Sequence, residues 1–162
     1  MSPMKTGVLA FALACAALCQ ACFHAEDSAI DSQCGKLAAT FFQLPVKEQI
    51  AKFPKQDLET QFSILICGNQ AIHPPAIYLA EPFAQEGSVT VALLKEKLSK
   101  PQGDLTVRDI VAVLSEMSRQ HTYDVARDVD LMRLVEDHVA AMKDDTWKLS
   151  VEHQVKDLRA AH

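Results

Sequence analysis

The stretch that decides the fold runs from Gly87 to Met117 and has the sequence GSVTVALLKEKLSKPQGDLTVRDIVAVLSEM. Two segments with apolar residues at three- and four-residue steps flank a short turn around Pro101 and Gly103. This periodicity predicts two amphipathic helices. Such a hairpin cannot bury both apolar faces by itself, so it requires further helices as neighbours. The sequence therefore predicts an all-α fold.

Helical periodicity also occurs on both sides of this hairpin, and no alternating apolar run bounded by turns predicts a strand. Gly68 and Asn69 are expected to end one helix, because both accept the left-handed conformation. Thr106 and Asp109 resemble a capping box. We expect about seven helices in a short α-solenoid or an irregular helical bundle. The other helical segments are expected at Ser28–Leu44, Val46–Phe53, Leu58–Ile66, Pro75–Glu86, Leu131–Met142 and Asp144–Leu158.

The first 25 residues resemble an export signal. Lys5 precedes an apolar run from Val8 to Leu18, and small and polar residues follow. This layout is typical of a secretory signal peptide, and the run is too short to span a bilayer. Cleavage after Ala21 fits the small-residue pattern at such sites. A degenerate lipobox ending at Cys22 offers an alternative, in which this cysteine is lipidated.

Composition restricts the classes of partner. The formal net charge is −5, and it becomes −6 without residues 1–25, which contain Lys5 and no acidic residue. An acidic chain has no overall basic surface for nucleic acid or anionic lipid. We therefore expect residues 26–162 to form one domain without a nucleic-acid partner, located in the periplasm or attached to a membrane only through Cys22.

Two cysteines, Cys34 and Cys67, remain beyond the export segment. In an oxidising compartment they are candidates for one disulfide, which would stabilise the fold by roughly 4 kcal/mol in the chain-entropy model. The alternative is two buried thiols in separate helices, since free cysteine is among the most buried residue types. The sequence leaves both open.

A degenerate repeat links the hairpin to the two helices after it. At an offset of 41 residues its apolar positions fall on apolar residues, and at an offset of 40 its turn matches residues 144–148. The turn aspartate Asp104 and the pair Val107 and Arg108 resemble the HEAT family of helical-hairpin repeats, over Gly87 to Leu158. The resemblance implies a short α-solenoid that binds proteins through one face and has no chemistry of its own.

The turns flanking the central hairpin contain the candidate binding residues. His73 lies in a His-Pro-Pro turn that is rigid before any partner binds, which lowers the ordering cost of association. The alternative role for His73 is to cap the preceding helix. The predicted binding residues are His73, Tyr78, Glu81, Arg119, His121 and Tyr123.

The sequence predicts no catalytic residue, metal site or cofactor. His138 and His153 belong to different predicted helices, and residues 26–162 contain no His-x-x-x-His or Cys-x-x-Cys spacing. Asp124, Asp128 and Asp130 lack the glycine and glutamate of an EF-hand loop, so we expect helix caps and solvated charges. No phosphate-binding loop or nucleophile elbow is present.

Three hypotheses follow. The first is an exported, non-enzymatic helical protein that binds another protein in the bacterial cell envelope. Immunity or inhibitor-type proteins are one such class by analogy, because they are often small, acidic, exported and helical. The second is an envelope hydrolase with a site near His73 and Glu81. The third is a structural or ligand-carrying helical bundle with an apolar cavity.

Overall fold

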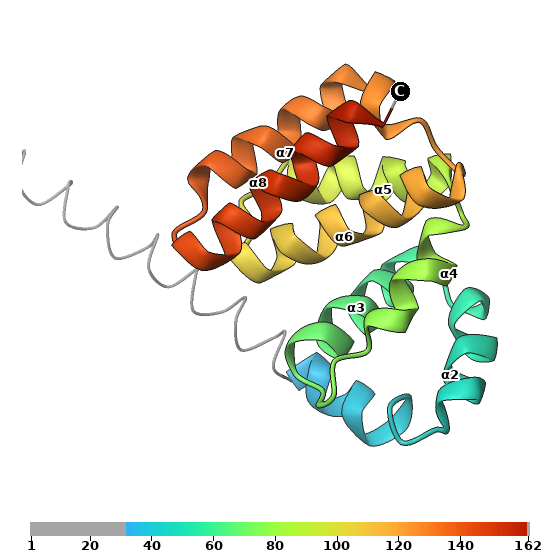
Figure 1. Ribbon diagram of the computed structural model, residues 1–162. Helices are drawn as coiled ribbons and strands as arrows, with labels where there is room; N and C mark the ends of the chain where they lie inside the picture. The colour runs from blue at the N-terminus through green and yellow to red at the C-terminus, as the bar shows by residue number, and fades with distance from the viewer. Residues whose placement is uncertain (1–31, 162) are drawn as a thin grey trace, which may run out of the picture.

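The computed structural model describes residues 32–161, and this part of the chain is all-α, as predicted (Figure 1). The proposed export segment and Cys22 lie outside the described residues. No described helix is both long and apolar enough to cross a membrane. A first helix includes residues 32–40, and it is followed by α2 (Val46–Lys52), α3 (Leu58–Gln70), α4 (Ala80–Ala84), α5 (Ser88–Leu98), α6 (Asp104–Gln120), α7 (Val129–Ala141) and α8 (Asp145–Ala160). The 3-10 helices are η1 (Phe53–Lys55), η2 (Ile77–Leu79) and η3 (Val125–Arg127).

Helix α6 lies at the centre of the core. It packs against α3, α4, α7 and α8, and seven of its 17 residues are buried. Ile110, Leu114 and Met117 are each 0% exposed. Full burial of one such side chain contributes about 1.5–3 kcal/mol, so the central helix of the predicted hairpin supplies a large part of the fold's stability.

The hairpins α5–α6 and α7–α8 stack on each other. Helix α6 packs along α8, α5 packs along α7, and α4 extends the layer of α6 and α8 on the other side (Figure 1). Helix α3 does not continue the opposite layer. Its first turn pairs Glu59 with Lys97 at the end of α5, whereas its last residue, Gln70, contacts the start of α6. The regular stack therefore covers α4 to α8, and the preceding helices are arranged irregularly.

Side chains join the turns of successive hairpins at both ends of the stack. Asp104 Oδ2 accepts hydrogen bonds from the backbone N–H groups of Lys143 and Asp144, at 2.9 and 2.7 Å. At the opposite end Thr122 Oγ1 donates to the carbonyl oxygen of Ala84 at 2.7 Å. The residues joined are 38 to 40 apart in sequence. The separation of Asp104 from Asp144 equals the predicted offset of 40, and the other two separations are one or two residues shorter.

Helix α2 buries a polar residue in place of two aliphatic ones. Gln49 is 4% exposed, whereas Val46 and Ile50 are 51% and 43% exposed. Gln49 Nε2 donates to the carbonyl oxygen of Leu44 at 2.7 Å, and its Oε1 accepts from the Tyr78 hydroxyl at 2.5 Å. Because both ends of the amide are satisfied, Gln49 can be buried at low cost.

Gly68 lies inside α3, so the prediction that Gly68 and Asn69 end this helix is wrong. The helix continues to Gln70. A Cβ atom at Gly68 would lie 2.8 Å from Ala76 Cβ and 2.9 Å from Phe42 Cζ. The glycine is therefore needed for close packing between α3 and its neighbours, and not for a left-handed helix end.

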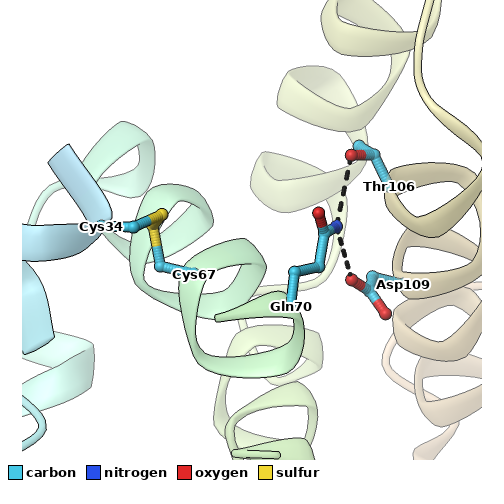
Figure 2. The surroundings of a disulfide bond; sticks show 5 residues. All are labelled: Cys34, Cys67, Gln70, Thr106 and Asp109. Atoms are coloured by element: carbon cyan, nitrogen blue, oxygen red, sulfur yellow. Dashed lines mark hydrogen bonds between the residues drawn. A yellow bond between two sulfur atoms is a disulfide. The ribbon is translucent and has the colours of Figure 1, made fainter. Parts of the chain in front are cut away.

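Cys34 and Cys67 form a disulfide, with Cα atoms 5.2 Å apart (Figure 2). The bond joins the first helix to α3. Both cysteines are buried, at 8% and 3% exposure. Of the two alternatives left by the sequence, the structure has the bridge.

Two helical glycines provide a matched test of the packing at α3. Gly68→Ala should lower the free energy of unfolding by about 1–3 kcal/mol, because the added methyl overpacks the contact with Phe42 and Ala76. Gly35→Ala should raise it by about 0.5–1 kcal/mol, since no atom lies within 4 Å of the added Cβ and alanine favours the helix. Urea denaturation measures both. Equal effects of the two substitutions would contradict the packing described here.

The disulfide also makes a quantitative prediction. The bridge closes a chain segment with a sequence separation of 33, so replacing both cysteines by serine should lower the free energy of unfolding by about 4 kcal/mol. Denaturant unfolding with and without reductant measures this change. The double variant should not respond to reductant, and an equally small response of the wild-type protein would show that the bridge does not form.

Candidate functional site

The outward face of α6 is the candidate site. Arg108, Ala112, Ser115 and Arg119 recur at three- and four-residue steps on the side opposite the buried residues of the helix. We call these four residues the α6 strip. The first three are half-buried, because α4 and α8 flank α6, and Arg119 is exposed. The strip thus has small side chains in its middle and an arginine at each end.

Arg108 is held in place on two sides. Its Nε and Nη2 atoms donate to Asp109 Oδ1 at 2.9 and 2.7 Å. Its guanidinium carbon lies 4.5 Å from the ring centroid of Trp147 on α8, which is a cation–π distance. Trp147 remains 37% exposed. The two side chains form a rigid, partly exposed pair at the boundary between successive hairpins.

Asp109 is the buried support of this pair. Its Oδ2 accepts a hydrogen bond from Gln70 Nε2 at 3.0 Å, and the same amide lies 3.4 Å from Thr106 Oγ1 (Figure 2). Helix α6 begins at Asp104, after a Gly103 cap without a side-chain hydrogen bond. The predicted capping box of Thr106 and Asp109 is therefore wrong, since both side chains bond to the end of α3.

Burial shifts the pKa of Asp109. The side chain is 3% exposed, and loss of water raises the pKa of its carboxyl group above the ordinary value. Hydrogen bonds from Gln70 and Arg108 act in the opposite direction without cancelling the effect of burial. The carboxylate is used inside the protein to position Arg108, and it is not available to a ligand.

Arg119 at the other end of the strip is also positioned by a carboxylate. Both its Nε, at 2.9 Å, and its Nη2 donate to Glu116. Hydrogen bonding to Glu116 raises the pKa of Arg119, and the negative charge of Glu81 on α4 acts in the same direction. Gln120 Nε2 bonds to the backbone oxygen of Glu81 at 3.2 Å. The structure thus brings together two of the predicted binding residues, Glu81 and Arg119.

His121 and Tyr123 follow α6 directly. His121 ends the helix in the left-handed conformation, with φ 56°, and it lines a shallow, open surface depression together with Tyr123. The Tyr123 hydroxyl donates to Asp128 Oδ2 at 2.6 Å, and Lys95 Nζ lies 2.7 Å from the same carboxylate. The hydrogen bond to Asp128, together with burial, raises the pKa of Tyr123 to about 12.

The aspartates of this loop cap helices, as predicted. Asp124 accepts from the backbone N–H of Arg127 in η3, and Asp128 accepts from that of Leu131 in α7. Hydrogen bonds from Lys95 and Tyr123 outweigh the effect of burial and lower the pKa of Asp128, so this cap is charged at neutral pH. Across residues 32–161 no group of three or more His, Cys, Asp and Glu side chains is arranged to hold a metal ion.

His73 and Tyr78 lie in a different place from the other predicted residues. His73 is exposed in the turn that follows α3, whose last residue contacts the beginning of α6, whereas Arg119 and His121 lie at the end of α6. His73 does not cap α3: the backbone N–H groups of Ala71 and Ala76 bond to the last carbonyls. Tyr78 is half-buried, and burial raises its pKa.

The middle of the strip was missed in the sequence. Ala112 and Ser115 carry no recognisable chemistry, and only the neighbours on α4 and α8 make their surface distinctive. Arg108 and Trp147 were each noticed, but not their contact. The repeat offset could have predicted this contact, since Arg108 and Trp147 are separated by nearly one repeat length.

Comparisons with known proteins add no family. No family model matches the chain, and searches of curated proteins and of solved structures found no significant match.

The buried carboxylate predicts an unusual pH dependence. Folding raises the pKa of Asp109. At pH values between the ordinary pKa of about 3.9 and the raised pKa, the folded state therefore binds more protons than the unfolded state. The stability of the wild type relative to Asp109→Asn should therefore fall as pH rises through this window. Urea unfolding measured at several pH values between about 3 and 7 tests this.

Asp57 provides a control of opposite sign. Its side-chain hydrogen bond with Thr60 at the start of α3 lowers its pKa. The wild type should exceed Asp57→Asn in free energy of unfolding by its full amount above about pH 3.9. This difference should disappear as pH falls through the lowered pKa of Asp57. If both variants changed with the same sign, Asp109 would not be titrating as a buried carboxyl group.

Proposed function

We propose that this chain is an exported, non-enzymatic protein that binds another protein in the bacterial cell envelope through the α6 strip. One observation carries the proposal: two arginines held by carboxylates, one of them stacked on a tryptophan, border small side chains on the central helix. An immunity or inhibitor-type role remains the class of function that we favour by analogy.

Pre-organised arginines favour protein recognition. Arginine and tryptophan are enriched among residues that contribute most to binding energy at protein interfaces. Ordering a long side chain on association costs roughly 0.5–1.5 kcal/mol, and Asp109 and Glu116 already restrict Arg108 and Arg119 before a partner arrives. Most of this cost is therefore met within the fold itself.

The centre of the strip suits close approach of a partner. Ala112 and Ser115 extend little from the helix, and the hydroxyl of Ser115 donates to the carbonyl oxygen of Val111 at 2.9 Å. A partner segment can lie against these small side chains without displacing them. The arginines at the two ends would then contact its polar groups, since guanidinium donors match carboxylates and backbone carbonyls.

The chemistry of the described cysteines, of Tyr123 and of His73 and Glu81 supports a non-enzymatic role. The Cys34–Cys67 bridge removes the described thiols as nucleophiles. A pKa of about 12 keeps the Tyr123 hydroxyl protonated at neutral pH. His73 and Glu81, the residues of the hydrolase hypothesis, share no hydrogen bond or ion pair in the described part of the chain. Proton transfer between such groups requires hydrogen-bond distance or one bridging water.

Two substitutions of alanine by glutamate test the α6 strip. Ala112→Glu places a charged side chain in its centre, and Ala92→Glu places the same side chain on the exposed face of α5 in the same hairpin. We expect the wild type and Ala92→Glu to recover one stoichiometric partner from envelope extract, and Ala112→Glu to lose at least tenfold in affinity, about 1.4 kcal/mol.

Circular dichroism and denaturant unfolding confirm that both variants fold. Recovery of no stoichiometric partner by the wild-type protein would count against protein binding as the function. Recovery that is equal for Ala112→Glu and Ala92→Glu would count against the α6 strip as the surface, because a buried glutamate at the centre of an interface is costly.

A further inference from the structure

The α2 surface combines exposed aliphatic side chains with lysines. Val46, Ile50 and Ile77 are 51%, 43% and 72% exposed. Ile77 belongs to η2. The hydroxyl of the next residue, Tyr78, donates to Gln49 on α2, and this bond places η2 beside α2. Lys47 is exposed on α2 between Val46 and Ile50. Lys55 is exposed in η1, which follows α2 directly. We call Val46, Lys47, Ile50, Lys55 and Ile77 the α2 surface.

The fold keeps these aliphatic side chains outside. Helix α2 turns Gln49 and the following Phe53 inward, at 4% and 0% exposure, and the amide of Gln49 is bonded at both ends. Rotation of the helix to bury Val46 and Ile50 would break both hydrogen bonds of that amide. Exposure of the aliphatic residues is therefore built into the packing of α2.

Charge on this part of the chain is opposite to that of the rest. Residues 46–55 contain three lysines and one glutamate, whereas residues 104–160 contain twelve acidic and eight basic residues. Glu48 pairs with Lys52, at 3.4 Å. Lys47 and Lys55 have no ion pair within the described residues. The net charge of −5 used to exclude anionic lipid is an average that conceals a basic segment.

We propose that the α2 surface contacts an anionic lipid membrane. Aliphatic side chains flanked by lysines suit the boundary between headgroups and acyl chains, where lysine stems cover apolar surface and the ammonium groups meet lipid phosphates. The surface contains no aromatic or arginine anchor of the kind that dominates protein interfaces, and this favours lipid over a protein partner.

The position of α2 in the molecule agrees with this proposal. Helix α2 lies in the same lobe as the start of the described chain (Figure 1). That start, residue 32, follows Cys22 by ten residues, so lipidation at Cys22 would hold the lobe within about 35 Å of the bilayer. A basic patch is a common second membrane contact of a lipid-anchored protein. In this respect the inference rests on the proposed envelope location.

Vesicle binding tests the proposal with the full chain carrying Cys22→Ser. Sedimentation with vesicles of phosphatidylcholine, alone or mixed with phosphatidylglycerol, measures the bound fraction. We expect stronger binding to the anionic vesicles than to the neutral ones. Added salt should weaken this binding. Lys47→Glu with Lys55→Glu should reduce it at least tenfold, since each lysine near such a surface contributes about fivefold. Ile50→Ser should reduce it severalfold.

The control makes the same charge change on the α7–α8 hairpin. Lys143→Glu with Lys156→Glu should leave binding to anionic vesicles within about twofold of the wild type, because both lysines lie outside the α2 surface. Residues 1–31 are common to all variants, so a difference in binding between two variants reports the substituted lysines. Equal binding to both kinds of vesicle, or equal losses in both lysine pairs, would overturn the proposal.

The two proposals can fail separately. If the α2 surface contacts lipid, Ala112→Glu should bind anionic vesicles as the wild type does. Loss of a protein partner in Lys47→Glu with Lys55→Glu, without any vesicle binding by the wild type, would instead assign the α2 surface to a protein and overturn the inference.

Discussion

The fold depends on the simultaneous burial of α6 by the helices on both sides. Its apolar residues cover too wide an arc for one neighbour, so α4 and α8 must both be present before Ile110, Leu114 and Met117 leave water. Hydrogen bonds between turns then set the register of the hairpins. The carboxylate of Asp104 accepts hydrogen bonds from two backbone N–H groups in the turn of the next hairpin. Any lengthwise shift of one hairpin along the other would break both bonds. The α6 strip exists because this arrangement leaves only one side of the helix uncovered.

The regular half of the molecule was predictable because its determinants are local. Helical periodicity located α5, α6, α7 and α8, and the match of Asp104 with Asp144 gave their spacing before the contacts between the turns were known. Asp124 and Asp128 were predicted as caps, since a cap depends on residues only three positions away. The disulfide was a different case. Its partners are far apart in sequence, and nothing in either helix distinguishes a bridged cysteine from a buried thiol.

The errors arose where a distant residue determines a local structure. Gly68 has the chemistry of a helix end, but Phe42 and Ala76 use its missing side chain for close packing. Thr106 and Asp109 have the spacing of a capping box, but Gln70 from α3 occupies their polar groups. At the candidate site the same limit applies. Arg119 and Glu81 were selected separately, and their proximity follows only from the packing of α4 on α6.

The bridge between Cys34 and Cys67 also has a consequence for proteolysis. The chain between these residues includes α2 and the exposed lysines at 47, 52 and 55, which are potential cleavage sites for trypsin-like proteases. A cut anywhere in that segment opens the backbone but releases no fragment, because the two pieces stay covalently joined through sulfur. The segment would also stay packed through the buried residues of α3 and the aromatic contact of Phe53 with Phe83. A nicked molecule would gain only the mass of one water and would keep most of its packing, and the two pieces would separate only after reduction.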